Sequence, residues 1–119
     1  MSDVRKPDAR ETALEVLMQV DSANAWSDGG LKRTIAKNKL DSRDAALATR
    51  LCFGVLQNKL LCDFYIGKFS TVKVERLENR VLNALRLGIY QMAFLTKIPA
   101  SAAVNESAEL ARKYSKNPR

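Results

Sequence analysis

The sequence predicts an all-α protein of about five to six helices. Apolar residues recur at spacings of three and four through most of the chain, which is the period of a helix. No segment shows a convincing strand alternation. Proline occurs only at Pro7, Pro99 and Pro118, so it lies near the ends and at one interior joint. The length of 119 residues suits one domain, and we expect 1–119 to form a single domain.

The first helix is expected over about residues 7–22. Its apolar stripe has helical spacing: Ala9, Ala13, Val16, Leu17 and Val20. Asn24, Ser27 and the pair Gly29 and Gly30 then predict a turn. A shorter second helix follows over residues 31–38. We expect its inward residues to be these: Leu31, Ile35 and Ala36.

The third predicted helix begins after Asp41, which suits an N-cap, and Asp44 lies near the positive end of its dipole. Apolar residues cover much of the circumference over residues 45–56. A helix that is apolar on most sides is normally buried at the centre of a fold. We expect a bend or break near Asn58. The apolar pattern continues after it: Leu60, Leu61, Phe64, Tyr65 and Ile66.

Residues 67–73 predict a loop. The next helix is expected from Glu75 or Glu78 to residue 97. Its inward residues are predicted as follows: Val81, Leu82, Leu85, Ile89 and Met92. Pro99 disfavours helical geometry at the residue before it and so ends this helix. Proline also suits the first turn of a last helix, which we expect to run to about residue 114.

The chain carries 20 Lys and Arg against 13 Asp and Glu, a net charge of +7. A surplus of this size favours polyanionic partners, with nucleic acid first and an anionic membrane surface second. Charge alone is equally consistent with a solvated basic surface. No apolar segment follows the charged start as in a signal peptide, and no apolar run could span a bilayer. We therefore expect a cytoplasmic protein without a membrane partner.

The sequence contains no arrangement of residues that suggests catalysis. It has no histidine, and Cys52 and Cys62 are too few to form a structural zinc site. About 15 Å of helix would separate these two residues, which is beyond disulfide reach. Their apolar neighbours indicate inert buried thiols in a reducing compartment. The glycines form no phosphate-binding loop. We expect no catalytic residue, no metal and no cofactor in this chain.

Three segments in order carry a family resemblance: residues 9–17 (ARETALEVL), residues 44–56 (DAALATRLCFGVL), and residues 85–91 (LRLGIYQ) followed by Ile98, Pro99 and residues 102–107 (AAVNES). Together they resemble the NusB fold family. The second and third runs are more similar to the branch fused to the ribosomal RNA methyltransferase RsmB, also called Sun or Fmu. The resemblance covers nearly the whole chain.

The resemblance implies a NusB-like helical bundle, here without the family's last helix, which would follow a linker near Ser115. It also implies an RNA-binding, non-catalytic domain that docks on 16S ribosomal RNA. A downstream methyltransferase domain would bind S-adenosylmethionine and methylate a cytosine at carbon 5. Two alternatives stay open: a free-standing NusB-type transcription antitermination factor, and a protein-interaction domain whose charge is incidental. No DNA partner is expected, and incompletely covered apolar faces would permit self-association.

NusB-like proteins carry an arginine-rich start that contacts RNA, and the matching residues here are Arg5, Lys6 and Arg10. This segment is sparse, because acidic residues alternate with the basic ones. Further positive charge follows in and after the second predicted helix: Lys32, Arg33, Lys37 and Lys39. Such contacts would go mainly to phosphates, which position RNA without reading its sequence.

Arg86 lies on an otherwise apolar side of its helix and needs a partner if it is buried. We predict a structural ion pair between Arg86 and Glu106, with Asp44 as a further candidate, in preference to an RNA contact. Losing Arg86 would then cost on the order of 3 kcal/mol. Tyr90 and Tyr114 are expected to be core rings rather than base-stacking platforms. Trp26 is either a lid on the core or an exposed contact.

Overall fold

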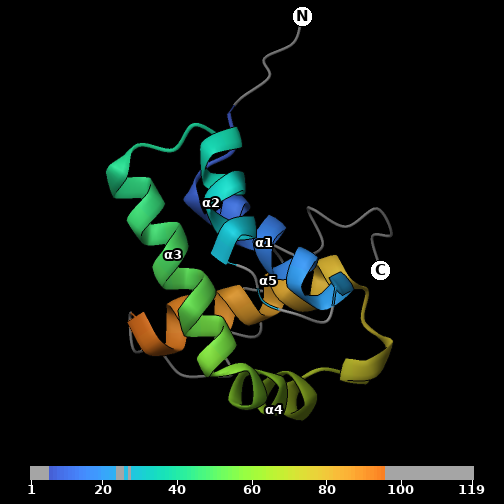
Figure 1. The fold of residues 1–119 in the computed structure, drawn as a ribbon. Helices are drawn as coiled ribbons and strands as arrows, with labels where there is room; N and C mark the ends of the chain where they lie inside the picture. The colour runs from blue at the N-terminus through green and yellow to red at the C-terminus, as the bar shows by residue number, and fades with distance from the viewer. Residues whose placement is uncertain (1–5, 24–25, 27, 96–119) are drawn as a thin grey trace, which may run out of the picture. The chain divides into compact units, whose positions relative to one another are not determined.

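The computed structural model describes residues 6–23, 26 and 28–95. Within these residues the chain forms five α-helices, two short helices of other types and no strand, which confirms the all-α prediction (Figure 1). The α-helices are α1 (Ala9–Ala23), α2 (Asp28–Lys37), α3 (Ser42–Gln57), α4 (Lys59–Phe69) and α5 (Asn79–Ile89). The 3₁₀ helix η1 (Val74–Arg76) precedes α5, and the π-helix η2 (Tyr90–Leu95) follows it. The predicted last helix, with Tyr114, lies outside the described residues.

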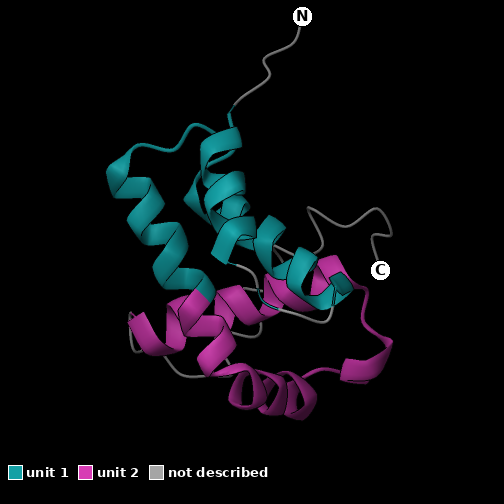
Figure 2. Cartoon of the chain, viewed as in Figure 1, with its two compact units in different colours: residues 1–52 teal, residues 53–119 magenta. Residues whose placement is uncertain are grey.

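Two compact units divide the chain, unit 1 (Met1–Cys52) and unit 2 (Phe53–Arg119) (Figure 2). Unit 1 contains α1, α2 and most of α3. Unit 2 contains the end of α3 and the elements that follow it. The expectation of one domain over 1–119 stays a prediction.

A reciprocal pair of hydrogen bonds fixes the start of α1. The Glu11 N–H donates to Asp8 Oδ1 at 2.8 Å, and the Asp8 N–H donates to Glu11 Oε1 at 2.9 Å. This capping box satisfies backbone groups that the first helical turn leaves without partners. Most of the predicted apolar stripe is buried: Ala9, Ala13, Val16 and Leu17.

Helix α2 begins at Asp28, earlier than predicted, so Gly29 and Gly30 lie in its first turn and not in a turn before it. An acidic residue at this end is favoured by the helix dipole, which explains why the helix extends back to Asp28. Gly30 is buried, and its carbonyl accepts a hydrogen bond from the Thr34 hydroxyl at 2.8 Å. Glycines at a helix start therefore need not interrupt the helix.

The inward face of α2 differs from the prediction at one position. Leu31 is buried and Ile35 is half-buried, but Ala36 is exposed. Thr34 and Asn38 are buried on the inward side. Their side chains make hydrogen bonds inside unit 1. These bonds allow polar residues to be buried, and a search for apolar residues alone does not find them.

Asp41 caps α3 as predicted, because its Oδ1 accepts a hydrogen bond from the Asp44 N–H at 2.8 Å. The buried apolar positions of this helix are Ala48, Leu51, Cys52 and Val55. The predicted break lies at Asn58, a turn residue between α3 and α4. Its side-chain amide donates to the Gly54 carbonyl at 2.8 Å and so closes the end of α3.

The core of unit 2 forms where α4 and α5 pack together. Its buried residues are Cys62, Ile66, Leu85 and Ile89. Around these pack half-buried side chains from α4, η1, α5, η2 and the residue after η1: Tyr65, Val74, Leu77, Val81, Leu82, Ala84, Met92 and Ala93. Helix α4 continues to Phe69, so the predicted loop begins later than Gly67. The Ser70 N–H donates to the Ile66 carbonyl at 2.8 Å and ends the helix there.

Helix α5 starts after Glu78, the later of the two predicted starts, because η1 occupies Val74–Arg76. After Ile89 the chain widens into the π-helix η2 instead of continuing as a regular α-helix. Tyr90 is buried at this junction, as predicted for a core ring. A Cβ at Gly54 would lie 2.1 Å from Tyr90 Cζ, so Tyr90 occupies space that only a glycine leaves open.

Candidate nucleic-acid interface

Side-chain hydrogen bonds join α1 to α2. The buried Asn38 amide donates to Thr12 Oγ1 at 2.9 Å and to Glu15 Oε1 at 3.3 Å. Further along α1, Gln19 Nε2 donates to Thr34 Oγ1 at 3.3 Å. Thr12, Glu15 and Gln19 are three and four residues apart, so they lie on one side of α1. These bonds determine which face of α2 turns inward.

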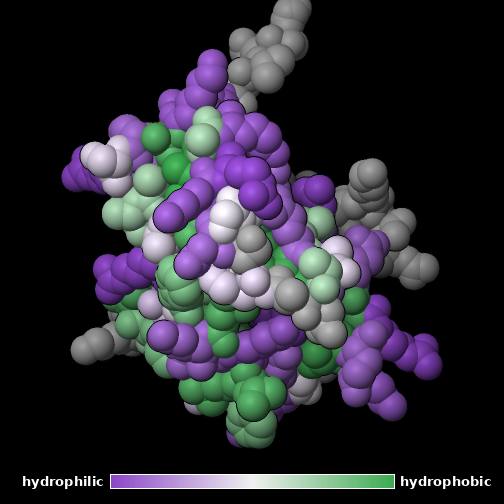
Figure 3. Space-filling model, in the orientation of Figure 1, coloured by the Kyte–Doolittle hydropathy of each residue, from purple (hydrophilic) through white to green (hydrophobic). Residues whose placement is uncertain are grey.

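The outward face of α2 is cationic as a result. Lys32, Arg33 and Lys37 are all exposed, while Thr34 on the same helix is buried. Neither Lys32 nor Arg33 forms an ion pair within the part of the chain that the structure describes. Hydrophilic side chains gather over the region of α2 in Figure 3. The structure thus brings three of the predicted RNA-contact residues onto one helix.

Lys37 is the cation of α2 that is held by a partner. Its Nζ donates to Glu15 Oε2 on α1 and forms an ion pair with it. Partial burial acts to raise the pKa of Glu15. The hydrogen bonds from Lys37 and Asn38 and the charge of Lys37 outweigh this effect, so the pKa of Glu15 is lowered. Glu15 therefore offsets part of the charge of Lys37.

Lys6 is positioned by the end of α2. Its Nζ donates to the Lys39 carbonyl at 3.0 Å. Lys39 has a positive φ of 55°, and two backbone bonds close the turn around it: Leu40 N–H to the Ile35 carbonyl at 3.3 Å and Lys39 N–H to the Ala36 carbonyl at 3.1 Å. This is a Schellman motif with a lysine where glycine is usual. It places Lys6 beside Lys39.

Arg10 is exposed on α1 but lies away from α2. At about 100° per residue, Arg10 is on roughly the opposite side of α1 from Gln19 and Glu15, which contact α2. The predicted basic residues therefore do not form one face. Arg5 lies outside the described residues. We define the α2 cationic surface as Lys6, Lys32, Arg33, Lys37 and Lys39.

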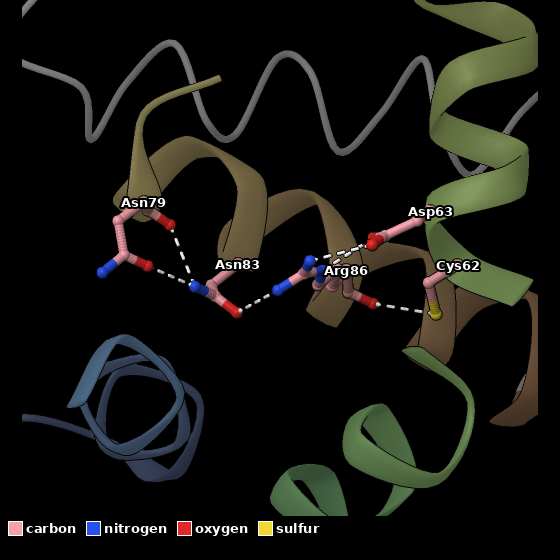
Figure 4. A network of polar contacts seen from close by, with 5 residues as sticks. All are labelled: Cys62, Asp63, Asn79, Asn83 and Arg86. Atoms are coloured by element: carbon pink, nitrogen blue, oxygen red, sulfur yellow. Dashed lines mark hydrogen bonds and ion pairs between the residues drawn. The ribbon is translucent and has the colours of Figure 1, made fainter. Parts of the chain in front are cut away.

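In unit 2, Arg86 is buried at 4% exposure and forms a bidentate pair with Asp63 of α4 (Figure 4). Arg86 Nε donates to Asp63 Oδ1 at 2.7 Å, and Nη2 donates to Oδ2 at 2.9 Å. Nη1 donates to Asn83 Oδ1 at 3.2 Å, and the Asn83 amide donates to the Asn79 carbonyl at 3.0 Å. The Cys62 thiol lies 3.8 Å from the Arg86 carbonyl. Arg86 thus links α5 to α4.

Among the described residues, Arg86 pairs with Asp63, whereas the sequence predicted a pair with Glu106. Glu106 lies outside the described residues, so its pairing with Arg86 stays a prediction. Asp63 is the residue that sequence reasoning missed. Its signal is visible in hindsight, because it is an isolated carboxylate within the apolar run of α4. Such a residue needs a cationic partner if its helix is packed on both sides.

Cys52 and Cys62 are both buried and neither forms a disulfide. Burial raises the pKa of Cys52 to about 12. Burial and the charge of Asp63 raise the pKa of Cys62 to about 11, against the opposing charge of Arg86. Burial therefore favours the protonated form of both thiols at neutral pH, and the predicted burial of the two residues is confirmed.

Trp26 is half-buried, and its indole N–H donates to Asp28 Oδ1 at 3.1 Å, which leaves both interpretations of this ring open. Among the described residues, no group of three or more His, Cys, Asp or Glu side chains could hold a metal ion. In the same residues, no helix has the length and apolar character needed to cross a membrane.

The sequence of this chain is similar to a family model and to two groups of named proteins. The family model described as "NusB family" matches residues 7–119. A Bacillus subtilis (strain 168) protein named "Probable ribosomal RNA small subunit methyltransferase B" is 37% identical over 109 residues, which cover 92% of this chain and 24% of that protein. The Synechocystis sp. protein of the same name is 28% identical, over 87% of this chain and 23% of its own length.

A second group of relatives carries a different name. The transcription antitermination protein NusB of Desulforudis audaxviator is 38% identical over 106 residues, which cover 88% of this chain and 77% of that protein. The chain therefore spans about a quarter of the two methyltransferase relatives and about three quarters of this NusB relative. The comparison with solved structures found no significant match. From the family model and the D. audaxviator relative, the chain belongs to the NusB family.

Proposed function

We propose that this chain is the non-catalytic RNA-binding domain of an S-adenosylmethionine-dependent ribosomal RNA cytosine-5 methyltransferase, and that it docks on 16S ribosomal RNA. The observation that carries RNA binding is the α2 cationic surface, on which Lys32 and Arg33 are exposed and Lys6 lies at Lys39, just after the end of the helix. Phosphates are suited to such a surface, because lysine and arginine heads can each neutralise a phosphate without reading a base.

The methyltransferase part of the proposal draws on the relatives. The B. subtilis and Synechocystis proteins are named as ribosomal RNA methyltransferases, and each is about four times as long as the segment that matches this chain. In the proposed arrangement, S-adenosylmethionine binds the remainder of the protein, and this domain brings that remainder to its RNA.

A free-standing transcription antitermination factor is the second candidate function. The favouring observation is the NusB of D. audaxviator, which this chain matches over 77% of that protein's length. The coding sequence beyond Arg119 separates the two candidates. A methyltransferase domain in the same reading frame supports the first, and a stop codon shortly after Arg119 supports the second.

RNA binding is tested by the salt dependence of the affinity for a fluorescent 16S ribosomal RNA fragment. We expect the logarithm of the binding constant to fall with the logarithm of salt concentration, by about 0.7 per single-strand phosphate contact. The double variant Lys32→Ala/Arg33→Ala should weaken binding and reduce this slope by about 1.4. The matched control is Lys73→Ala/Arg76→Ala, which removes the same exposed charges from unit 2. Equal losses in both variants, or binding that ignores salt, would contradict the proposal.

A further inference from the structure

Helix α4 presents large apolar side chains to solvent. Leu60 is 86% exposed, Phe64 is 60% exposed and Leu61 is 40% exposed. Phe64 is four residues from Leu60 and three from Leu61, so it neighbours both on the helix surface, and we define these three residues as the α4 apolar face. Hydrophobic atoms gather over α4 in the lower part of Figure 3. Nearby in sequence, Phe69 and Val72 are also exposed.

None of the three residues of the α4 apolar face belongs to the core of unit 2. Cys62 and Ile66, on the other side of α4, are fully buried and pack with Leu85 and Ile89 of α5. Helix α4 therefore completes its contribution to the core with one face and carries a second apolar face outward. Single exposed apolar residues are ordinary on a protein surface, but a contiguous group marks an interaction site.

The charges around the α4 apolar face are positive. Lys68 is exposed one turn after Phe64, and its Nζ lies 5.9 Å from the centroid of the Phe64 ring. The same Nζ lies 5.9 Å from the Phe69 ring. Both carboxylate oxygens of Asp63, the acidic residue of α4, already accept hydrogen bonds from Arg86. An approaching partner therefore meets apolar side chains with an ammonium group beside them.

We propose that the α4 apolar face docks a protein segment whose apolar side chains are flanked by Asp or Glu, in the manner of an amphipathic helix laid against a helical face. Its apolar side chains would cover Leu60 and Phe64, and a carboxylate would pair with Lys68. Charge complementarity selects this occupant, because a carboxylate beside the apolar stripe offsets the Lys68 charge. The site is in unit 2 and is separate from the α2 cationic surface in unit 1.

The same charge argument disfavours the other occupants. A symmetric pair of copies presents one surface to itself and would bring two Lys68 residues to one interface. RNA needs several cations for its phosphates, whereas the cation that contacts the Phe64 and Phe69 rings is Lys68. These occupants become outcomes of the experiment.

The test uses the 119-residue chain and two synthetic helical peptides. Both peptides carry leucines at spacings of three and four, and one has flanking glutamates where the other has lysines. Binding is measured by fluorescence anisotropy, with phosphatidylglycerol vesicles and sedimentation of the chain alone as further arms. We expect the glutamate peptide to bind at least about tenfold more tightly than the lysine peptide, a difference of about 1.4 kcal/mol.

Substitutions on the surface of α4 test whether the peptide binds there. Leu60→Ser/Phe64→Ser should weaken binding of the glutamate peptide about tenfold or more while leaving the melting temperature nearly unchanged, because both side chains are already exposed. Lys68→Glu should reverse the preference in favour of the lysine peptide. The matched control Lys32→Ala/Arg33→Ala in unit 1 should bind both peptides as the unmodified chain does.

Four results would overturn this proposal: equal binding of the two peptides, peptide binding that survives Leu60→Ser/Phe64→Ser, self-association that this variant abolishes, or vesicle binding in place of peptide binding. The RNA proposal is tested separately, because Leu60→Ser/Phe64→Ser should bind the ribosomal RNA fragment with unchanged affinity. Loss of RNA binding in the unit 1 variant and loss of peptide binding in the unit 2 variant are thus distinguishable.

Discussion

Arg86 can lie almost fully buried in unit 2 because its guanidinium group donates hydrogen bonds to Asp63 and Asn83. Asp63 accepts two of its hydrogen bonds, Asn83 accepts another, and Asn79 in turn accepts from Asn83. A guanidinium is suited to this arrangement, because its planar fork matches a carboxylate bidentately. The Asp63 side chain keeps 23% of its exposure, so the pair is at the edge of the core rather than at its centre.

Replacing Arg86 should therefore be costly. Arg86→Met removes both bonds to Asp63 and leaves that carboxylate beside an apolar core. We expect the free energy of unfolding to fall by about 3 kcal/mol, measured by urea denaturation. Arg80→Met, an exposed position on the same helix, is the matched control and should change stability by less than about 0.5 kcal/mol. Equal effects of the two substitutions would show that Arg86 has no structural role.

Glu15 predicts a pH dependence in unit 1. Its pKa is lowered in the folded chain, so its contribution to stability is present above the unfolded-state pKa and is lost as pH falls through the folded value. The pair with Lys37 is partly exposed, so we expect a contribution of about 0.5 kcal/mol. Glu15→Gln should be less stable than the unmodified chain at about pH 7, and the gap should close by about pH 3.

The comparison is made by urea denaturation at each pH. A stability gap that stays constant down to low pH would show that Glu15 acts through packing and not through its charge.

Sequence reasoning predicted the structural role of Arg86 but chose its partner by helix order along the chain. Glu106 was chosen because the helix after Pro99 should pack antiparallel to α5, and this pairing stays a prediction. Asp63 was not considered, because only the packing of α4 on α5 brings it to the guanidinium. A pattern along one helix shows that a buried charge needs a partner, but the tertiary fold decides which residue supplies it.

At the scale of helices, local rules located most boundaries and apolar faces. The N-cap at Asp41 and the break at Asn58 follow from side chains that bond to nearby backbone, so both could be predicted. Helix α2 could not be placed as well. Its glycines resemble a turn. The buried residues Thr34, within the helix, and Asn38, just after it, are polar, so the apolar pattern gave no reason to bury them.

The two glycines of α3 and α4 should respond oppositely to alanine. A Cβ at Gly54 would lie 2.1 Å from Tyr90 Cζ, whereas a Cβ at Gly67 would lie 3.7 Å from Val74 Cγ2, an ordinary contact. Gly54→Ala should therefore reduce stability by about 1–3 kcal/mol or more through overpacking. Gly67→Ala should increase it by about 0.5–1 kcal/mol, because alanine restricts the unfolded chain.

Thermal unfolding of the two variants checks this pair. Gly54→Ala/Tyr90→Ala should be less sensitive to the added methyl than Gly54→Ala alone, because the obstructing ring is removed. Destabilisation by Gly67→Ala as large as that by Gly54→Ala would contradict the packing of Tyr90 against α3.

At the scale of the whole chain, the net charge of +7 predicted a polyanionic partner but not its location. Exposure divides the basic residues into separate groups. Lys6, Lys32, Arg33 and Lys39 are exposed on or beside α2, Arg10 lies on another side of α1, and Arg86 is internal. The family was predictable from three sequence segments, whereas the arrangement of cations depends on the side-chain bonds between α1 and α2.

The most direct test of RNA binding by this domain is to map the contact residue by residue. An isotope-labelled sample of the chain is titrated with the 16S ribosomal RNA fragment, and backbone amide shifts are followed by NMR. We predict that the largest shifts fall on α2 and on the segment around Lys6 and Lys39, with little change along α4. Shifts concentrated on α4 and α5, or no shifts on α2 at saturating RNA, would contradict the account.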